Sequence, residues 1–275
     1  MKASELILNP DGSIYHLDLL PEDVAHNVIF VGDPDRVQQV SQHFDRIDFK
    51  KHKREFITHT GWYKAHRITV MSTGIGTDNV DIVINELDAL VNIDFTTRTI
   101  KEKLTSLNII RIGTSGSIHP ELDSDELLVS TLAVGTDNLG EYYQSKKANH
   151  PLLPPWSYYV ERHGYDLKNF PAPFKEGITL TCPGFYGPQG RMLRLSPTYT
   201  IPIDDLHKEE WNGYPFTNLE METAAVYLLA ELLGHKAISL NAILANRLSG
   251  KFSHNPGKTV DELIVHTLEW ISRSA

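Results

Sequence analysis

The chain has 275 residues, 41% of them hydrophobic and 22% charged, a composition that argues against a disordered protein and suits one large domain spanning residues 1–275. Its 35 acidic and 26 basic residues give a formal net charge of −9, which argues against a general nucleic-acid binder, because such a protein needs a basic surface. The single cysteine, Cys182, excludes an intramolecular disulfide and a cysteine-based zinc site, and the 13 histidines show no metal-ligand spacing, so we expect no structural metal.

Apolar periodicity and turn residues predict alternating strands and helices. In chain order they are a strand at 28–32, a helix within 33–44, a hairpin of strands at 56–63 and 66–73, a helix at 77–91, a strand that passes into a glycine-rich segment within 108–118, strands at 126–134 and 177–182, a helix at 222–234, a strand at 236–246 and a closing helix from Pro256. This alternation predicts a layered α/β sandwich, and the hairpin makes its sheet mixed. We expect 96–107 and 140–175 to be insertions or helical excursions.

The chain shows no targeting or membrane signal. No apolar run approaches the roughly 20 residues of a membrane-spanning helix, and the first residues lack the apolar core of a secretory signal. We therefore expect a cytoplasmic protein.

The segment "VGDPDR" (31–36) follows a predicted strand and opens a helix, a place that favours a bound anion. Gly32 would let the backbone approach the anion, and Arg36 adds a positive charge. An ordinary turn in which Asp33 caps the helix explains the same residues. Neither this segment nor any other has the full phosphate-binding or dinucleotide-binding pattern, so ATP and NAD are not expected.

Two further glycine-rich segments follow the same logic. In "RIGTSGS" (111–117) we expect the strand to end and a small-residue loop with two hydroxyls to begin at Gly113. Arg111 would lie inside the strand, where an unpaired charge is costly, so it should have an anionic partner. The segment "STGIGTDN" (72–79) is equally consistent with packing of a helix against a sheet.

Two pairs of polar side chains could meet a ligand. In the loop "GFYGPQGR" (184–191), Gln189 and Arg191 are two residues apart and should point the same way, as suits a planar heterocycle. A solvated surface turn explains the same loop. Glu220 and Glu222 precede a helix and could accept bonds from paired ribose hydroxyls. A capping box formed by Thr217 and Glu220 explains the same acids equally well.

These motifs, in this order, resemble the nucleoside phosphorylases of the uridine phosphorylase type. The resemblance extends from about His16 to about Arg247 and rests on "GDPDR", "REF" (54–56), "STGIG", "RIGTSGS", "FYGPQGR", "EMET" (220–223) and "NR" (246–247). It implies a single-domain three-layer α/β/α sandwich with a central mixed sheet.

The resemblance also implies a set of site residues. Phosphate would bind Gly32, Arg36, Arg111 and Thr114, with Arg54 lent by a neighbouring subunit. Ribose would bind Glu220, Met221 and Glu222, with His16 reaching across the subunit interface. The base would bind Ser115, Phe185, Gln189 and Arg191. The catalytic residues would be Arg111, Gln189 and Arg191, in a dimer or a hexamer that shares its active sites.

The implied reaction is phosphate-dependent cleavage of uridine to uracil and ribose 1-phosphate, in pyrimidine nucleoside salvage or breakdown. No acid stands near Asn246 and Arg247, where purine-cleaving relatives carry one. Phosphate is a co-substrate and no cofactor is expected. A monovalent cation stays open, since Glu55 matches a ligand in some members but Asn79 takes the place of a serine. The sequence also leaves open cleavage of deoxyuridine, thymidine or purine nucleosides, hydrolysis by water, and a catalytically idle nucleoside-binding protein.

Overall fold

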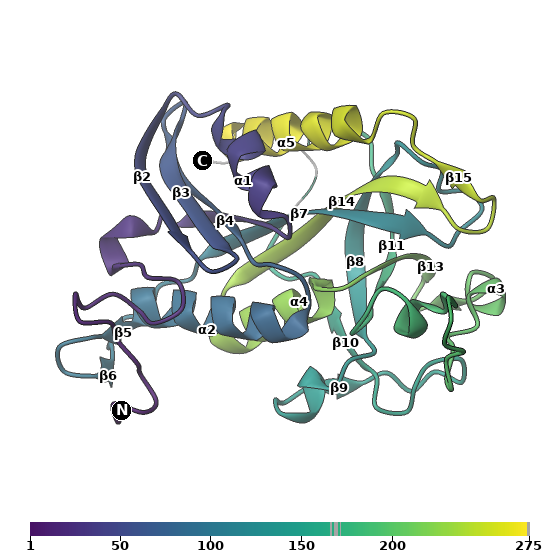
Figure 1. Cartoon of the computed structure of the whole chain (residues 1–275), viewed down its shortest axis with the longest axis horizontal. Helices are drawn as coiled ribbons and strands as arrows, with labels where there is room; N and C mark the ends of the chain where they lie inside the picture. Colours follow the sequence, from purple (N-terminus) through teal and green to yellow (C-terminus); the bar gives the residue numbers. More distant parts are fainter. Residues whose placement is uncertain (166, 168–169, 171, 274–275) are drawn as a thin grey trace.

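One large mixed β-sheet runs through the molecule (Figure 1). The computed structural model describes residues 1–165, 167, 170 and 172–273. From edge to edge the sheet contains β12 (Glu210–Trp211), β13 (Tyr214–Glu220), β11 (Lys175–Thr181), β8 (Leu127–Gly135), β14 (Lys236–Asn246), β7 (Asn108–Ser117), β1 (Asn27–Val31), β4 (His66–Ser72), β3 (Phe56–Tyr63) and β2 (Arg46–Lys53). The short strands β9 (Lys146–Lys147), β10 (Tyr158–Glu161) and β15 (Lys251–Phe252) pair at its sides, and β5 (Ile93–Asp94) with β6 (Thr99–Ile100) forms a separate ribbon.

Helices cover both faces of this sheet, as a three-layer sandwich requires. On one face lie α2 (Thr77–Asn92) and α4 (Thr223–Leu233), and on the other lie α1 (Pro34–Ser41) and α5 (Pro256–Arg273). Strand β1 shows why: Val28 and Phe30 pack with the first pair of helices, and Ile29 and Val31 with the second. Successive side chains of a strand point to opposite faces, so a continuous apolar run suits a strand buried on both sides. The remaining helical turns are η1 (Pro21–Asp23), η2 (Leu139–Glu141), η3 (Gly187–Gln189) and α3 (Ile203–Leu206).

Part of the sheet closes on itself. Strand β13 pairs with β11 on one side and, through Asn218 and Leu219, with β7 on the other. The five strands β13, β11, β8, β14 and β7 therefore form a ring. Strand β7 is also parallel to β1, which is parallel to β4, so the carboxyl ends of these three strands meet at one edge. Open α/β sheets bind ligands at such an edge.

The main expectations about the fold are confirmed, and three details are wrong. The predicted sandwich, mixed sheet and hairpin (β3 with β4) are present. The glycine loop expected at Gly113 is instead strand, because β7 continues to Ser117 through its pairing with β14. For 96–107 and 140–175 the helical alternative is also wrong, since the described residues there carry β6, β9, β10 and one short helical turn, and the alternative of insertions stays a prediction. Residues 166, 168, 169 and 171 lie outside the described residues.

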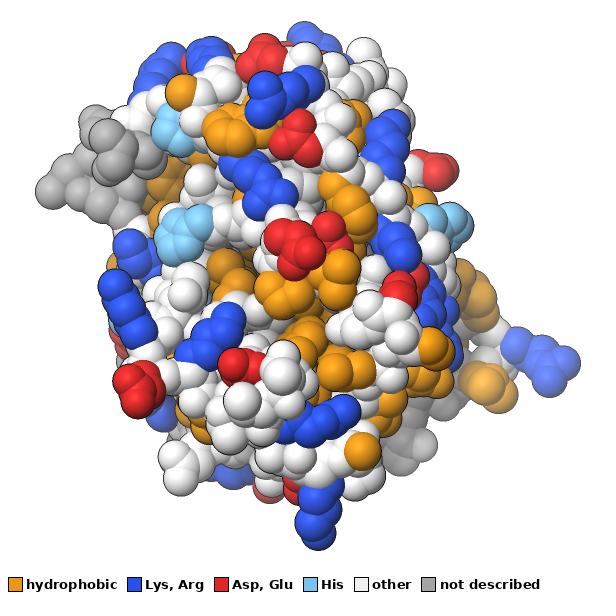
Figure 2. All heavy atoms as spheres, turned by 90° about the vertical axis from the view of Figure 1, so that its left-hand side faces the viewer, with side chains coloured by type: hydrophobic (Ala, Val, Ile, Leu, Met, Phe, Trp, Pro, Cys, Tyr) orange, Lys and Arg blue, Asp and Glu red, His pale blue; other side chains and the backbone are white. Residues whose placement is uncertain are grey.

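Strand β2 forms the outer edge of the sheet, and none of its eight residues is fully buried. Figure 2 shows the side of the molecule where β2 lies, with hydrophobic side chains gathered in a band among charged ones. No helix in the described part of the chain is both long and apolar enough to cross a membrane.

Candidate active site

A cavity of about 860 Å³ opens where β1, β4 and β7 end, and it gathers residues from every motif of the resemblance except "NR" (246–247). Eleven of the residues expected in a site line it: Gly32, Arg36, Arg111, Thr114, Ser115, Phe185, Gln189, Arg191, Glu220, Met221 and Glu222. His16 and Arg54 do not line it. The cavity brings together residues that are up to 220 positions apart, from Gly32 to Phe252.

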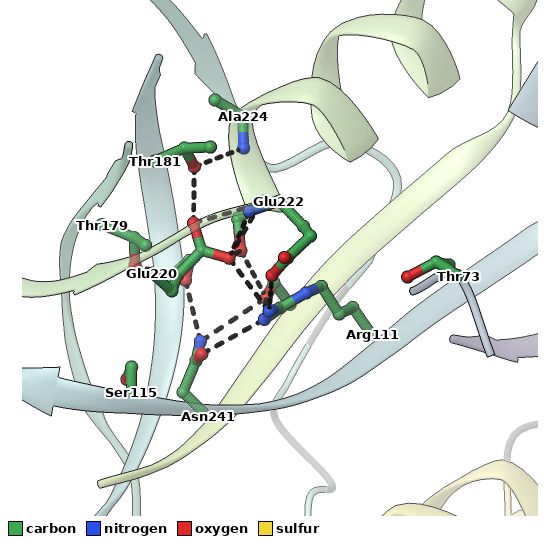
Figure 3. Close-up of polar contacts among 12 residues, drawn as sticks. Thr73, Arg111, Ser115, Thr179, Thr181, Glu220, Glu222, Ala224 and Asn241 are labelled. Carbon is green, nitrogen blue, oxygen red and sulfur yellow. Dashed lines mark hydrogen bonds and ion pairs between the residues drawn. The ribbon is translucent and has the colours of Figure 1, made fainter. Parts of the chain in front are cut away.

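Arg111 lies at the centre of the polar contacts at this cavity (Figure 3). Its Nη2 atom is 2.6 Å from Glu222 Oε2 and 3.0 Å from Glu220 Oε2, and its side chain is buried. The predicted anionic partner of Arg111 is thus confirmed. Burial lowers the pKa of Arg111, but the two carboxylates raise it by more. Burial also raises the pKa of Glu222, and Glu220 adds to this, whereas Arg111 acts against it.

Gly113 makes room for the Arg111 side chain. A Cβ atom at this position would overlap Arg111 Nη1 and would lie 2.9 Å from Asn241 Oδ1. The guanidinium group therefore folds back over the strand that carries it, which only a glycine two residues ahead permits. The glycine that suggested a loop serves to accommodate the arginine.

The two carboxylates each bind the start of a helix. Glu220 Oε2 accepts hydrogen bonds from the backbone N–H groups of Glu222 and Thr223 at the start of α4, both at 2.9 Å. Glu222 Oε1 accepts from Gly76 N, the cap of α2, at 2.8 Å. The capping box with Thr217 is not formed, because Thr217 lies within β13 and its hydroxyl donates to Ile178 O at 3.0 Å. Acids at helix starts are stabilised by the helix dipole.

A third helix start, that of α1, lies beside this cluster. Asp33 caps α1 by accepting from Asp35 N at 3.0 Å, so that prediction is confirmed. Arg36 also lines the cavity, and its buried Nε has no hydrogen-bond partner among the described residues. Burial lowers the pKa of Arg36, and the nearby charge of Arg111 lowers it further. This arginine can therefore bind an added anion.

The loop "GFYGPQGR" contains one short helical turn, η3, and then Gly190 in the left-handed region with φ of 70°. Gln189 and Arg191 meet as expected, since Arg191 Nη1 donates to Gln189 Oε1 at 2.5 Å. Arg191 also donates to Phe185 O at 2.7 Å, and its guanidinium carbon lies 3.8 Å from the centre of the Phe185 ring. Arg247 also stabilises this turn by donating a hydrogen bond to Gln189 O. The pair is thus fixed at the wall of the cavity.

His16 and Arg54 lie elsewhere on this chain. His16 Nδ1 is 2.6 Å from Glu86 Oε1, at a second cavity of about 290 Å³. Arg54 is exposed on the turn between β2 and β3, with φ of 56°. Their expected contribution to a neighbouring subunit's site stays a prediction.

Several lining residues were not predicted from the sequence, chiefly the apolar side chains Ile75, Leu244 and Phe252. Ile75 stands between two glycines in a segment whose pattern did suggest a site. Phe252 follows a turn after β14 and no pattern marks it, because pairing of β15 with β14 brings it to the cavity. Glu55 and Asn79 also line the cavity. No group of three or more His, Cys, Asp or Glu side chains suited to a metal occurs in the described ranges.

Comparisons with known proteins identify the family of this chain. The family described as "Phosphorylase superfamily" matches residues 27–268. A uridine phosphorylase of Thermococcus kodakarensis is 31% identical over 245 residues, which cover 88% of this chain and 80% of that protein. A purine nucleoside phosphorylase, DeoD-type, of Listeria monocytogenes is 24% identical over 258 residues, with 92% and 97% covered. A solved Trypanosoma brucei nucleoside phosphorylase, which shows uridine phosphorylase activity, has a TM-score of 0.83 and 27% identity, covering 96% of this chain and 99% of that one.

Proposed function

The chain belongs to the phosphorylase superfamily, and we propose on that premise that it is a uridine phosphorylase, which cleaves uridine with inorganic phosphate to uracil and ribose 1-phosphate. One observation carries this proposal most directly. A single cavity is lined by Arg36, whose buried Nε has no hydrogen-bond partner among the described residues, and by the bonded pair Gln189 and Arg191. An anion and a planar polar base could therefore bind in the same cavity.

Phosphate is proposed to bind beside Gly32, where α1 begins. Arg36, Thr114 and Arg111 line the same cavity as Gly32. Helix starts offer free N–H groups and a favourable dipole to an anion. The repulsion between Arg36 and Arg111 gives a further reason for an anion to bind, since it would compensate both charges.

The nucleoside is proposed to lie between this anion and the base loop. Glu222 and Met221 would contact the ribose, with Glu220 holding Glu222 and Arg111 in place through the bonds described above. Phe185 would form one wall for the base. Gln189 and Arg191 would form hydrogen bonds with the polar edge of the base, for which amide and guanidinium groups are well suited.

The reaction then needs no covalent bond to the protein. A phosphate oxygen attacks C1′ of the ribose, the bond from C1′ to the base nitrogen breaks, and its electron pair moves onto the uracil ring. Negative charge develops on the carbonyl oxygens of the base, and the nitrogen finally takes a proton. Arg191 and the amide of Gln189 would stabilise that charge, and one such preplaced donor contributes on the order of 3 kcal/mol.

Cleavage of purine nucleosides is the second candidate, because a purine nucleoside phosphorylase is among the relatives. Protonation of a purine base would call for an acid near Asn246 and Arg247. Asn246 is buried and donates to His119 O and Leu122 O, both at 2.9 Å. Arg247 is a cation. These residues favour uridine over a purine nucleoside.

The test is to incubate the protein with uridine, deoxyuridine, thymidine and inosine, each with and without phosphate, and to measure release of the free base. We expect fast release from uridine only when phosphate is present. Equal release without phosphate would identify a hydrolase, and faster release from inosine would show that the base assignment is wrong. Binding of uridine without turnover of any nucleoside would identify a nucleoside-binding protein without catalytic activity.

A further inference from the structure

A line of buried polar side chains connects Arg111 to Ser115 behind the wall of the cavity. The contacts, in order, are Arg111 Nη1 to Asn241 Oδ1 (3.3 Å), Asn241 Nδ2 to Ser130 Oγ (3.2 Å), Ser130 Oγ to Thr179 Oγ1 (2.5 Å), Thr179 Oγ1 to Asn218 Oδ1 (2.7 Å) and Asn218 Nδ2 to Ser115 Oγ (2.9 Å). We call these six residues the polar chain. Figure 3 shows Arg111, Asn241, Thr179 and Ser115 on their strands.

The polar chain crosses every strand of the closed ring. Arg111 and Ser115 both come from β7, and the four inner members come one each from β14, β8, β11 and β13. All four inner side chains are completely buried. Buried polar groups are costly unless each is bonded, and a fully bonded network is rigid. A purely apolar filling would serve stability as well, so the polar chain invites a functional explanation.

The hydrogen bonds in the polar chain can run in one direction only. A guanidinium group donates and never accepts, so Asn241 must present its oxygen to Arg111 and its NH₂ to Ser130. Ser130 then gives its single hydrogen to Thr179, because Thr179 commits its own single hydrogen to the amide oxygen of Asn218, which can only accept. Thr179 gives its hydrogen to Asn218 Oδ1. The amide NH₂ of Asn218 is thus directed to Ser115.

Ser115 therefore accepts a hydrogen bond from the polar chain and keeps its own hydrogen. In the part of the chain that the structure describes, Asn218 is the hydrogen-bond partner of its hydroxyl. Ser115 is half-buried and lines the cavity. Its O–H group is consequently available to an acceptor in the cavity and is prevented from pointing back into the core.

We propose that the polar chain is a positioning device, in which Arg111 sets the direction and Ser115 is held as a hydrogen-bond donor toward a carbonyl oxygen of the bound base. This inference rests on the proposed function for the identity of the ligand. Asn241, Ser130, Thr179 and Asn218 act through Ser115 and do not touch the substrate. These four residues should affect binding of the nucleoside only, so KM for phosphate should not depend on Thr179.

The kinetic test uses Thr179→Val, which removes the hydroxyl at constant shape and interrupts the polar chain. Loss of one oriented hydrogen bond should raise KM for uridine about five-fold, with KM for phosphate within about two-fold of the wild type. Thr179→Ser keeps the hydroxyl and should restore the wild-type KM. Thr60→Val is the matched control, since Thr60 is also a completely buried strand residue and its hydroxyl donates to Asp23 O at 2.7 Å, outside the polar chain.

A double-mutant cycle separates positioning from general support of the fold. Ser115→Ala should raise KM for uridine as much as Thr179→Val, and the double variant should be no worse than either, because both changes remove the same donor. Multiplied effects in the double variant would overturn the proposal, and so would a Thr179→Val enzyme that behaves like Thr60→Val.

A neutron diffraction map of the deuterium-exchanged wild-type protein tests the direction without any assay of activity. The deuterium on Thr179 Oγ1 should point to Asn218, and that on Ser115 Oγ should point into the cavity. The reverse orientation would overturn the inference. A wild-type protein that cleaves no nucleoside would overturn the proposed function instead, and the neutron map would still decide on the polar chain.

Discussion

Arg191 is the residue on which the proposed choice of base depends most. Its guanidinium group is bonded to Gln189 and Phe185 O and stacked on the Phe185 ring, so it is already placed before a substrate arrives. Arg191→Ala removes a donor aimed at developing negative charge. We expect kcat/KM for uridine to fall by about 100-fold or more, measured by release of uracil.

Arg194→Ala supplies the control for that variant. Arg194 is exposed on the same loop and does not line the cavity, and its loss should leave kcat/KM for uridine near the wild-type value. Equal losses in the two variants would mean that the loop's overall charge matters and that Arg191 has no special position.

How far single residues could be predicted depends on the kind of physics involved. The need of Arg111 for an acid follows from the cost of a buried charge, which applies whatever the fold. The identity of that acid does not follow, because Glu222 is 111 positions away and only the folding of β7 against β13 and α4 brings it there. The need for a glycine at position 113 could not be predicted either, since it depends on how the Arg111 side chain folds back.

Among the elements, the contact of α1 with β3 contains a titratable group away from the cavity. His59 on β3 is buried, and its Nδ1 lies 2.7 Å from the hydroxyl of Ser41 on α1. Burial lowers the pKa of His59 from 6.5 to about 4, and the charge of Lys50 acts in the same direction. The folded protein therefore keeps this imidazole neutral at pH values where the unfolded chain protonates it.

This difference predicts a loss of stability in mild acid. The stabilising effect is complete above the unfolded pKa of 6.5 and is lost as pH falls toward the folded pKa of about 4. Between pH 7 and about pH 4.5, the free energy of unfolding should fall by on the order of 2 kcal/mol through His59 alone. In urea titrations over the same pH range, the free energy of unfolding of His59→Gln should fall by about 2 kcal/mol less than that of the wild type.

An exposed histidine serves as the control for the acid effect. His254 lies on the surface, so His254→Gln should lose stability with pH in parallel with the wild type. If His59→Gln also parallels the wild type, the buried imidazole is not a source of the acid sensitivity.

Elements with a clear apolar pattern could be predicted from the sequence, and strands that are charged or set by long-range pairing could not. The apolar runs of β1 and β14 and the strong helix α4 match their expected ranges closely, whereas β7 continues past Gly113, where a loop was expected. Strand β2 was missed because its sequence "RIDFKKHK" is mostly charged and no residue in it is fully buried. Strand β13 was not predicted, because its pairing with both β11 and β7 is a long-range feature.

At the scale of the whole molecule, the cavity brings together all the expected site residues except His16 and Arg54. Both lie outside the cavity, on the N-terminal segment and on the turn after the edge strand β2. That side of the molecule carries a band of hydrophobic side chains (Figure 2), and Met1, Ile7 and Tyr15 of the N-terminal segment are exposed. Such surfaces are typical of interaction sites, which supports the expectation of an oligomer with shared sites.

The expected sharing of sites between subunits can be tested with mixed oligomers. Arg36→Ala and Arg54→Ala should each be nearly inactive alone. In a dimer that contains one subunit of each kind, one site combines the intact Arg36 of its own subunit with the intact Arg54 of the neighbour, and the other site has both defects. Heterodimers purified with two different tags should therefore show about half of the wild-type kcat for uridine cleavage. If Arg54 acts within its own subunit, neither site is complete and the heterodimer stays inactive.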